Sequence, residues 1–201
     1  MTEWDEALHK IDEIHLRLAE TERFRGYRAL PVLGSGLLAI ATAVAQPLLV
    51  PDPARQLGGY LGLWIGVAAV SLAAALVTML LRVRGGAALD PESVRLALGQ
   101  FLPCLVAGAA VTAVLAPDCA WLLPGLWQVL FSLGVFASAR LLPPQALAVA
   151  AWYLGCGVAC LAWARGPAAF SPWAMGLPFG AGQLASAAVL FWTLERTHDD
   201  A

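Results

Sequence analysis

Residues 29–51 read ALPVLGSGLLAIATAVAQPLLVP, a stretch without a single Asp, Glu, Lys or Arg. A helix needs about 20 predominantly apolar residues to cross the hydrocarbon core of a bilayer, so this stretch is long enough to span a membrane. Further stretches of this kind follow it, and each again lacks all four charged residue types: 56–81, 96–117, 119–139, 141–164 and 166–194. The pattern predicts a polytopic integral membrane protein with six transmembrane helices.

The composition supports this prediction. The 201 residues are 60% hydrophobic and 13% charged, whereas soluble domains carry about 25% charged residues. A charged side chain at the bilayer centre costs at least ~2.5–3.5 kcal/mol, which explains why the spans exclude it. The net charge of −2 argues against nucleic-acid binding, because that function needs a concentrated basic face.

We expect an all-α fold in three parts. An amphipathic cytoplasmic helix occupies residues 1–28, a six-helix transmembrane bundle residues 29–195, and a cytoplasmic tail residues 196–201. The first 28 residues lack the apolar segment of a signal peptide, so we expect the first span to direct the chain to the membrane. The expected spans are about 29–50, 57–81, 99–116, 119–140, 145–164 and 172–194.

The basic residues predict the orientation, because Lys and Arg are retained on the cytoplasmic side. With both termini inside the cell, Arg55 and Arg165 alone lie outside. The others are cytoplasmic: Lys10, Arg17, Arg23, Arg25, Arg28, Arg82, Arg84, Arg95, Arg140 and Arg196. We therefore expect a plasma (inner) membrane protein with its N-terminus and C-terminus in the cytoplasm.

The N-terminal helix carries an apolar stripe formed by Trp4, Leu8, Ile11 and Leu18. This stripe could pack on the bundle, on a neighbouring subunit or on a cytosolic protein, or it could lie on the membrane surface. We favour packing, because the polar face is more acidic than basic and an anionic membrane surface attracts Lys and Arg.

Three glycines in the second expected span, Gly58, Gly62 and Gly66, are four residues apart and so share one helix face. Such a ridge lets a second helix approach closely, and we expect it to serve helix packing. A groove that lines a pore is the functional alternative.

The sequence also suggests an internal repeat. Tyr60-Leu61-Gly62 in the second span recurs 93 residues later as Tyr153-Leu154-Gly155 in the fifth. Leu102-Pro103 in the third span resembles Leu177-Pro178 in the sixth. Two halves of three helices each would be inverted in the membrane, as in many transporters. Chance matches are the alternative, because Leu, Ala, Gly and Pro dominate these spans.

Apart from Arg140 at the inner end of the fourth, no expected span contains a His or a charged residue. This excludes the usual intramembrane proton relay and the paired histidines of transmembrane haem. We find no catalytic, cofactor or metal-binding signature, so we expect no cofactor and no enzyme, although a membrane enzyme stays a third hypothesis. The four cysteines, in or beside the spans, are interpreted as buried structural thiols.

Gln128 and Gln183 carry the only amides well inside spans, beside scattered Ser and Thr, while Gln46 and Gln100 fall near span ends. Burying an unpaired amide is costly, so both inner amides should face protein or water. Interhelical hydrogen bonding is one interpretation. The other is a solute path formed by Gln128, Gln183, Pro178 and Gly180, in which the two amides share a pocket beside a helix that Pro178 breaks.

The leading hypothesis is therefore a small channel or transporter for a neutral or weakly polar solute, embedded in membrane lipid as a homo-oligomer. The alternative is a non-transporting regulatory or scaffold protein that recruits a cytosolic partner through its N-terminal helix.

Overall fold

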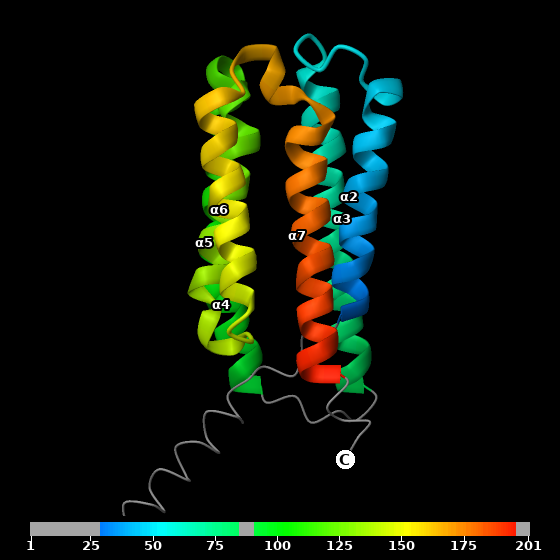
Figure 1. The fold of residues 1–201 in the computed structure, drawn as a ribbon, viewed down its shortest axis with the longest axis vertical. Helices are drawn as coiled ribbons and strands as arrows, with labels where there is room; N and C mark the ends of the chain where they lie inside the picture. The colour runs from blue at the N-terminus through cyan, green and yellow to red at the C-terminus, as the bar shows by residue number, and fades with distance from the viewer. Residues whose placement is uncertain (1–28, 85–90, 196–201) are drawn as a thin grey trace, which may run out of the picture.

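The computed structural model describes residues 29–84 and 91–195, where every regular element is helical. The long helices run along one common axis (Figure 1). They are α2 (Ala29–Leu49), α3 (Leu57–Arg84), α4 (Pro91–Cys119), α5 (Leu123–Ala137), α6 (Ala146–Trp163) and α7 (Pro172–Leu190). Short helical turns join or extend them: η1 (Ala120–Leu122), η2 (Ala139–Leu141), η3 (Gly166–Phe170) and η4 (Phe191–Glu195). The expected N-terminal helix with its stripe (Trp4, Leu8, Ile11, Leu18) and the tail lie outside the described residues.

The described chain contains five helical stretches long and apolar enough to cross a membrane, which identifies an all-α membrane protein. They are Ala29–Leu49, Leu57–Leu81, Gly99–Ala137, Ala146–Trp163 and Gly166–Thr193. The sequence predicted six spans. The difference arises in the third stretch, which contains both α4 and α5, joined through η1.

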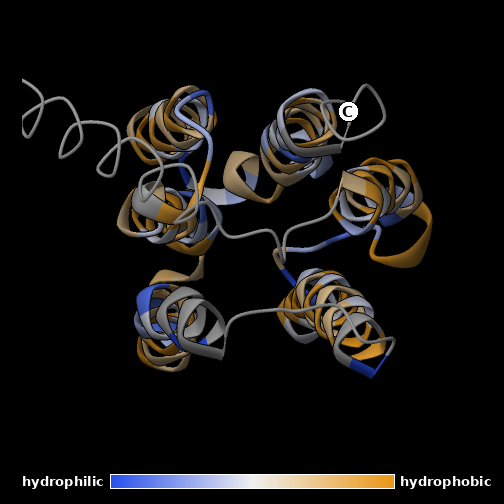
Figure 2. Ribbon diagram, turned by 90° about the horizontal axis from the view of Figure 1, so that it is seen from below, coloured by the Kyte–Doolittle hydropathy of each residue, from blue (hydrophilic) through white to orange (hydrophobic). Residues whose placement is uncertain are grey.

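The long helices form two groups of three, seen as two rows in Figure 2. In one group α2 packs against both α3 and α7, and in the other α5 packs against both α4 and α6. The two groups meet mainly where α6 packs on α7. Many large apolar side chains are exposed, among them Leu37, Val70, Val106 and Val158, as expected for helices in contact with lipid.

Glycines allow the closest helix pairs to form. A Cβ added to Gly180 of α7 would lie 2.5 Å from Ile40 of α2, and one added to Gly176 would overlap the Cβ of Ala43. In the other group, a Cβ on Gly125 of α5 would lie 2.9 Å from the carbonyl oxygen of Gly157 in α6. These contacts are the close helix approach that small residues permit in membranes.

The expected glycine ridge on α3 is not part of these close helix contacts. A Cβ added to Gly58, Gly62 or Gly66 would meet nothing within 4 Å, so these positions face no other helix of the described chain. Packing of the ridge against a second copy of the chain stays a prediction.

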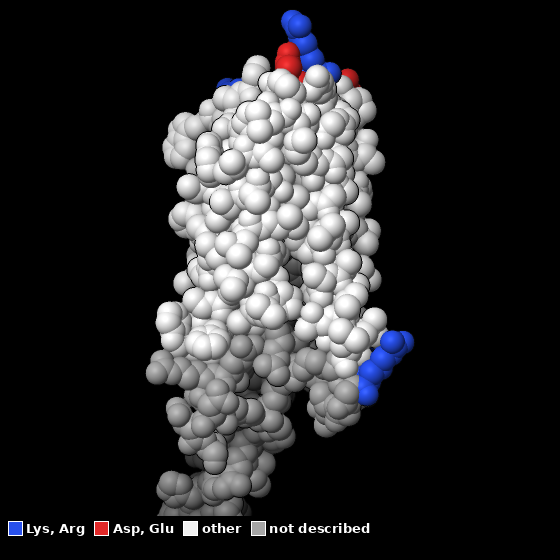
Figure 3. All heavy atoms as spheres, turned by 90° about the vertical axis from the view of Figure 1, so that its right-hand side faces the viewer, with Lys and Arg blue, Asp and Glu red and all other residues white. Residues whose placement is uncertain are grey.

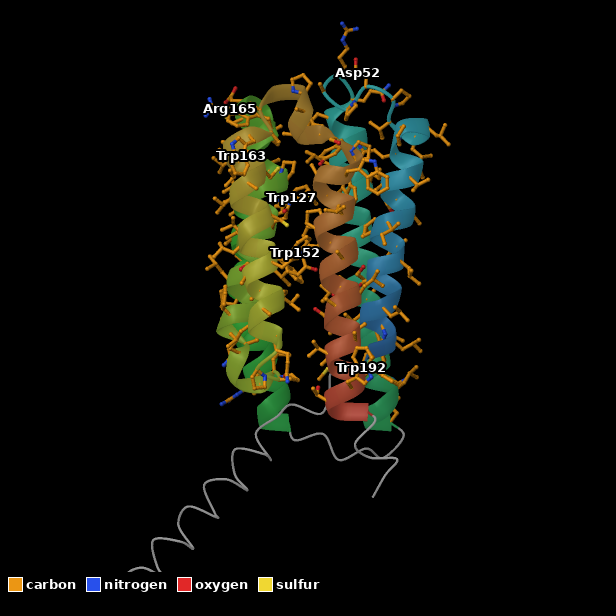
Figure 4. The ribbon with its side chains drawn as sticks, viewed as in Figure 1. Asp52, Trp127, Trp152, Trp163, Arg165 and Trp192 are labelled. Carbon is orange, nitrogen blue, oxygen red and sulfur yellow. The ribbon has the colours of Figure 1, made fainter. Side chains whose placement is uncertain are left out.

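Charged side chains lie at the two ends of the molecule, and the face between them is uncharged in Figure 3. One end holds Asp52, which pairs with Arg55 at 3.4 Å, and also Arg165 (Figure 4). Arg84 ends α3 and therefore lies a full helix length away from Arg55. We call these the Arg165 end and the Arg84 end.

The structure does not show the inverted repeat, which stays a prediction. The matched positions behave differently from one pair to the next. Tyr60 and Tyr153 are both fully buried, and a Cβ on Gly62 or Gly155 would meet nothing within 4 Å. In contrast, Pro103 of α4 is exposed and Pro178 of α7 is buried.

Candidate functional site

Gln128 of α5 is fully buried, and its amide reaches across to α7. Its Nε2 donates to the carbonyl oxygen of Pro124 at 3.1 Å, within α5, and to that of Ala174 in α7 at 2.9 Å. Pro178 has no N–H, so it cannot donate the helical hydrogen bond that the carbonyl of Ala174, four residues earlier, would normally accept. Gln128 supplies the hydrogen bond that Pro178 removes.

A second buried amide, Gln46 of α2, joins three elements. Its Nε2 donates to the carbonyl oxygen of Phe170 in η3 at 2.9 Å, and its Oε1 accepts from Nε1 of Trp64 in α3 at 2.9 Å. The sequence placed Gln46 near a span end, beside Pro47, and so gave it no role. The sequence feature that could have identified Gln46 is an amide within an apolar helix, because a buried amide must find hydrogen-bond partners.

These amides adjoin one buried cluster near the Arg165 end. The ring of Tyr60 in α3 packs edge-on against Phe170, with centroids 5.0 Å apart, and both belong to the same core as Trp64 and Met175. The sulfur of Met175 lies 4.0 Å from Nε2 of Gln128. We call this set the amide cluster: Gln46, Tyr60, Trp64, Gln128, Phe170 and Met175.

Four aromatic rings from four helices form a second layer, further toward the Arg84 end. Phe131 of α5 lies at its centre, with centroid distances of 5.4 Å to Phe101 of α4, 4.8 Å to Tyr153 of α6 and 5.5 Å to Phe179 of α7. The Tyr153 ring lies directly over Gly182 of α7, where a Cβ would overlap it. These rings, the aromatic layer, fill space between the two groups of helices.

The two groups are also joined next to this layer. Trp152 of α6 donates from its Nε1 to the carbonyl oxygen of Pro178 in α7 at 3.1 Å (Figure 4). Two hydrogen bonds from the other group therefore flank the Pro178 region: Trp152 donates to the carbonyl of Pro178, and Gln128 donates to the carbonyl of Ala174, one turn earlier. Both bonds hold α7 against the other group at its weakest backbone point.

Several buried polar atoms of the described residues have no hydrogen-bond partner. Two belong to the amide cluster, Tyr60 Oη and Gln128 Oε1, and one, Tyr153 Oη, to the aromatic layer. Two more, Gln100 Oε1 and Ser138 Oγ, lie near the Arg84 end, where α5 ends. An unsatisfied buried polar group costs about 1–3 kcal/mol, so such atoms are rare and need an explanation. Here they lie at several depths: in the amide cluster, in the aromatic layer and near the Arg84 end.

The expected pocket shared by Gln128 and Gln183 is not formed, which corrects the sequence interpretation. Gln183 is half-buried on the face of α7 that packs on α2, with its Cβ 3.1 Å from a Cβ built on Gly36. Gln128 contacts α7 at Ala174, nine residues earlier, which is about 13 Å along the helix and half a turn around it. The two amides therefore lie on opposite faces of α7. Gly180 is buried against α2, and Pro178 is buried beside Trp152.

Within residues 29–84 and 91–195, no group of three His, Cys, Asp or Glu side chains could hold a metal ion. The four cysteines, Cys104, Cys119, Cys156 and Cys160, are half-buried free thiols. Comparison of the chain with protein families, with curated proteins and with solved structures finds no match.

Proposed function

We propose that this protein is a small channel or transporter that carries an uncharged polar solute across a membrane. The observation that carries the proposal is the set of unpartnered buried atoms at several depths: those of Tyr60 and Gln128 in the amide cluster, Tyr153 in the aromatic layer, and Gln100 and Ser138 near the Arg84 end. A solute or water passing between the helix groups would find hydrogen-bonding atoms along its way. Charged side chains are described only near the two ends, which favours uncharged cargo.

The proposal includes six membrane crossings with both termini in the cytoplasm. It is supported by the packing of α4 against α5 and by the contact of η1 with η3, which follows Arg165. The chain between α4 and α5 would therefore turn at the Arg165 end, and each of the two helices would cross once. The Arg165 end would then be the external face, consistent with the uneven distribution of basic residues.

The two layers suggest different roles along the path. The amide cluster supplies polar atoms next to apolar rings, the combination typical of sites for small molecules. The aromatic layer is a hydrophobic barrier, because its rings pack edge to face across α4, α5, α6 and α7. Passage requires the layer to open. A movement of α7 would break the hydrogen bonds from Gln128 and Trp152 that hold it, and Pro178 gives α7 a point at which it can bend.

The test is solute flux in lipid vesicles that contain the purified full chain. Osmotic shrinkage and reswelling with urea or glycerol is followed by light scattering and compared with protein-free vesicles. We expect faster reswelling with protein, and a further increase for Phe131→Ala, which opens the centre of the aromatic layer. Val114→Ala is the matched control, because Val114 of α4 is 72% exposed on the outer surface. Rates equal to those of empty vesicles for both solutes and for Phe131→Ala would contradict the proposal.

A further inference from the structure

The amide cluster holds two polar atoms that the protein itself does not use. Gln128 and Tyr60 are both 0% exposed. Gln128 is oriented by its partners: both are carbonyl oxygens, so the group facing them must be the NH₂, and Oε1 is the free atom. Tyr60 Oη is the second free atom. The sulfur of Met175 lies 4.0 Å from Nε2 of Gln128, and Met175 belongs to the same buried core as Tyr60, so Gln128 and Tyr60 both adjoin this core.

The chemistry of these atoms defines what they can bind. An amide oxygen accepts hydrogen bonds and cannot donate them, so a ligand at Gln128 must donate an N–H or O–H. A phenol hydroxyl can donate, so a ligand at Tyr60 can present a carbonyl or hydroxyl oxygen. The other members of the cluster are a thioether, an indole, a phenyl ring and the already paired Gln46. No member carries a charge, and an ion without a counter-charge would pay its full desolvation cost there.

We propose that the amide cluster is a binding site for a small uncharged molecule that carries both a donor N–H and an acceptor oxygen, as primary amides and ureas do. The N–H donates to Gln128 Oε1, and the oxygen accepts from the hydroxyl of Tyr60. This inference rests on the proposed function and specifies the solute class of the same path.

The test compares two isomers, propionamide and N,N-dimethylformamide, which have the same atoms and differ in whether the nitrogen carries hydrogen. Binding to the full chain in detergent micelles is measured by the ligand-dependent rise in unfolding temperature. We expect propionamide to raise it in a saturable manner and N,N-dimethylformamide, like the propionate ion, to leave it unchanged. Equal shifts with the two isomers would overturn the proposal.

Tyr60→Phe is the decisive variant, because the hydroxyl that it removes has no protein partner. The ligand-free protein should unfold at the parental temperature, while propionamide binds about three- to ten-fold more weakly, as expected for one lost hydrogen bond. Tyr153→Phe is the matched control: it removes an equally buried, unpartnered hydroxyl in the aromatic layer and should leave binding unchanged. Unchanged binding in Tyr60→Phe would refute the site.

Flux separates this inference from the proposed function. Suppose that vesicles with protein pass urea faster than empty vesicles, but that Tyr60→Phe binds propionamide as the parent does. The transport proposal is then supported and the binding site is refuted. If no solute passes faster than in empty vesicles while Tyr60→Phe loses propionamide binding, the binding site is supported and the transport proposal is refuted.

Discussion

Gln128 of α5 fills a gap in the backbone hydrogen bonding of α7 that Pro178 creates. The carbonyl of Ala174 cannot receive a hydrogen bond from residue 178, and the Gln128 side chain donates to it instead at 2.9 Å. The residue that weakens α7 and the residue that compensates for it thus come from different helices, and the bond between them joins the two helix groups.

We predict that the effects of Gln128→Leu and Pro178→Ala on stability are strongly coupled. Gln128→Leu alone should lower the free energy of unfolding by about 0.6–2 kcal/mol, because the Ala174 carbonyl loses its partner. In a Pro178→Ala background the new backbone N–H can bond that carbonyl, so the same substitution should cost clearly less. A double-mutant cycle by unfolding titration in detergent micelles measures the coupling.

Gln183→Leu is the control for this cycle, because Gln183 lies on the opposite face of α7, away from Gln128. Its effect should add to that of Pro178→Ala without coupling. Additive behaviour of Gln128→Leu and Pro178→Ala would show that the Ala174 carbonyl does not depend on Gln128.

We predict that glycines at the helix contacts and glycines on the open ridge respond oppositely to a larger side chain. Gly176→Ala should destabilise the chain by about 1–3 kcal/mol, because the new methyl group overlaps Ala43 of α2. Gly62→Ala, with nothing within 4 Å, should be neutral or slightly stabilising, since Ala favours the helix by about 1 kcal/mol over Gly. Equal losses for the two variants would contradict the observed helix pairing.

Gly62→Leu tests the remaining use of the ridge. If the ridge packs against a second copy, this variant should keep the unfolding free energy of one chain but lose oligomer mass in native mass spectrometry. An unchanged oligomer mass would mean that the ridge does not pack against a second copy and that Gly62 faces lipid.

The sequence was sufficient to predict where helices lie, because exclusion of charge from a bilayer is a strong and local constraint. The expected span 57–81 corresponds to α3, and 145–164 to α6, within a few residues. The cost of an unpaired amide also predicted that Gln128 faces protein or water, and it lies buried with its amide bonded to α7. What the sequence could not supply was the rotation of each helix about its axis, which depends on its neighbours.

That rotation explains why Gln128 and Gln183 lie apart and why the ridge on α3 meets no other helix of the described chain. Gln128 and Gln183 are at plausible depths for one pocket, but the α7 residue that Gln128 contacts lies half a turn away from Gln183. The ridge of Gly58, Gly62 and Gly66 is a regular pattern, yet the close contact of α2 with α7 uses Gly36, Gly176 and Gly180. The sequence analysis assigned none of these three to helix packing.

We predict that Asp52, Asp118 and Arg165 lie on one side of the membrane and Arg84 on the other. Each is replaced singly by Cys in a background with the four native cysteines replaced by Ala, and intact cells are treated with an impermeant thiol reagent. The first three positions should be labelled and Arg84→Cys should not. Labelling of Asp52→Cys without Asp118→Cys would mean that the chain does not turn at η1, and labelling of Arg84→Cys alone would reverse the orientation.

The last prediction concerns Gln46, which the sequence did not single out. Gln46→Leu leaves two buried groups without partners, Nε1 of Trp64 and the carbonyl of Phe170. Because each unsatisfied group costs about 1–3 kcal/mol, this variant should be among the least stable single substitutions in the bundle.

Trp64→Phe is the comparison variant for Gln46→Leu. It removes a donor and leaves one acceptor, Gln46 Oε1, unpaired, while Gln46 keeps its bond to Phe170. Apart from the packing loss of the smaller ring, Trp64→Phe should therefore cost less than Gln46→Leu. A Gln46→Leu protein that unfolds like the parent would mean that α2, α3 and η3 are held together by apolar packing alone.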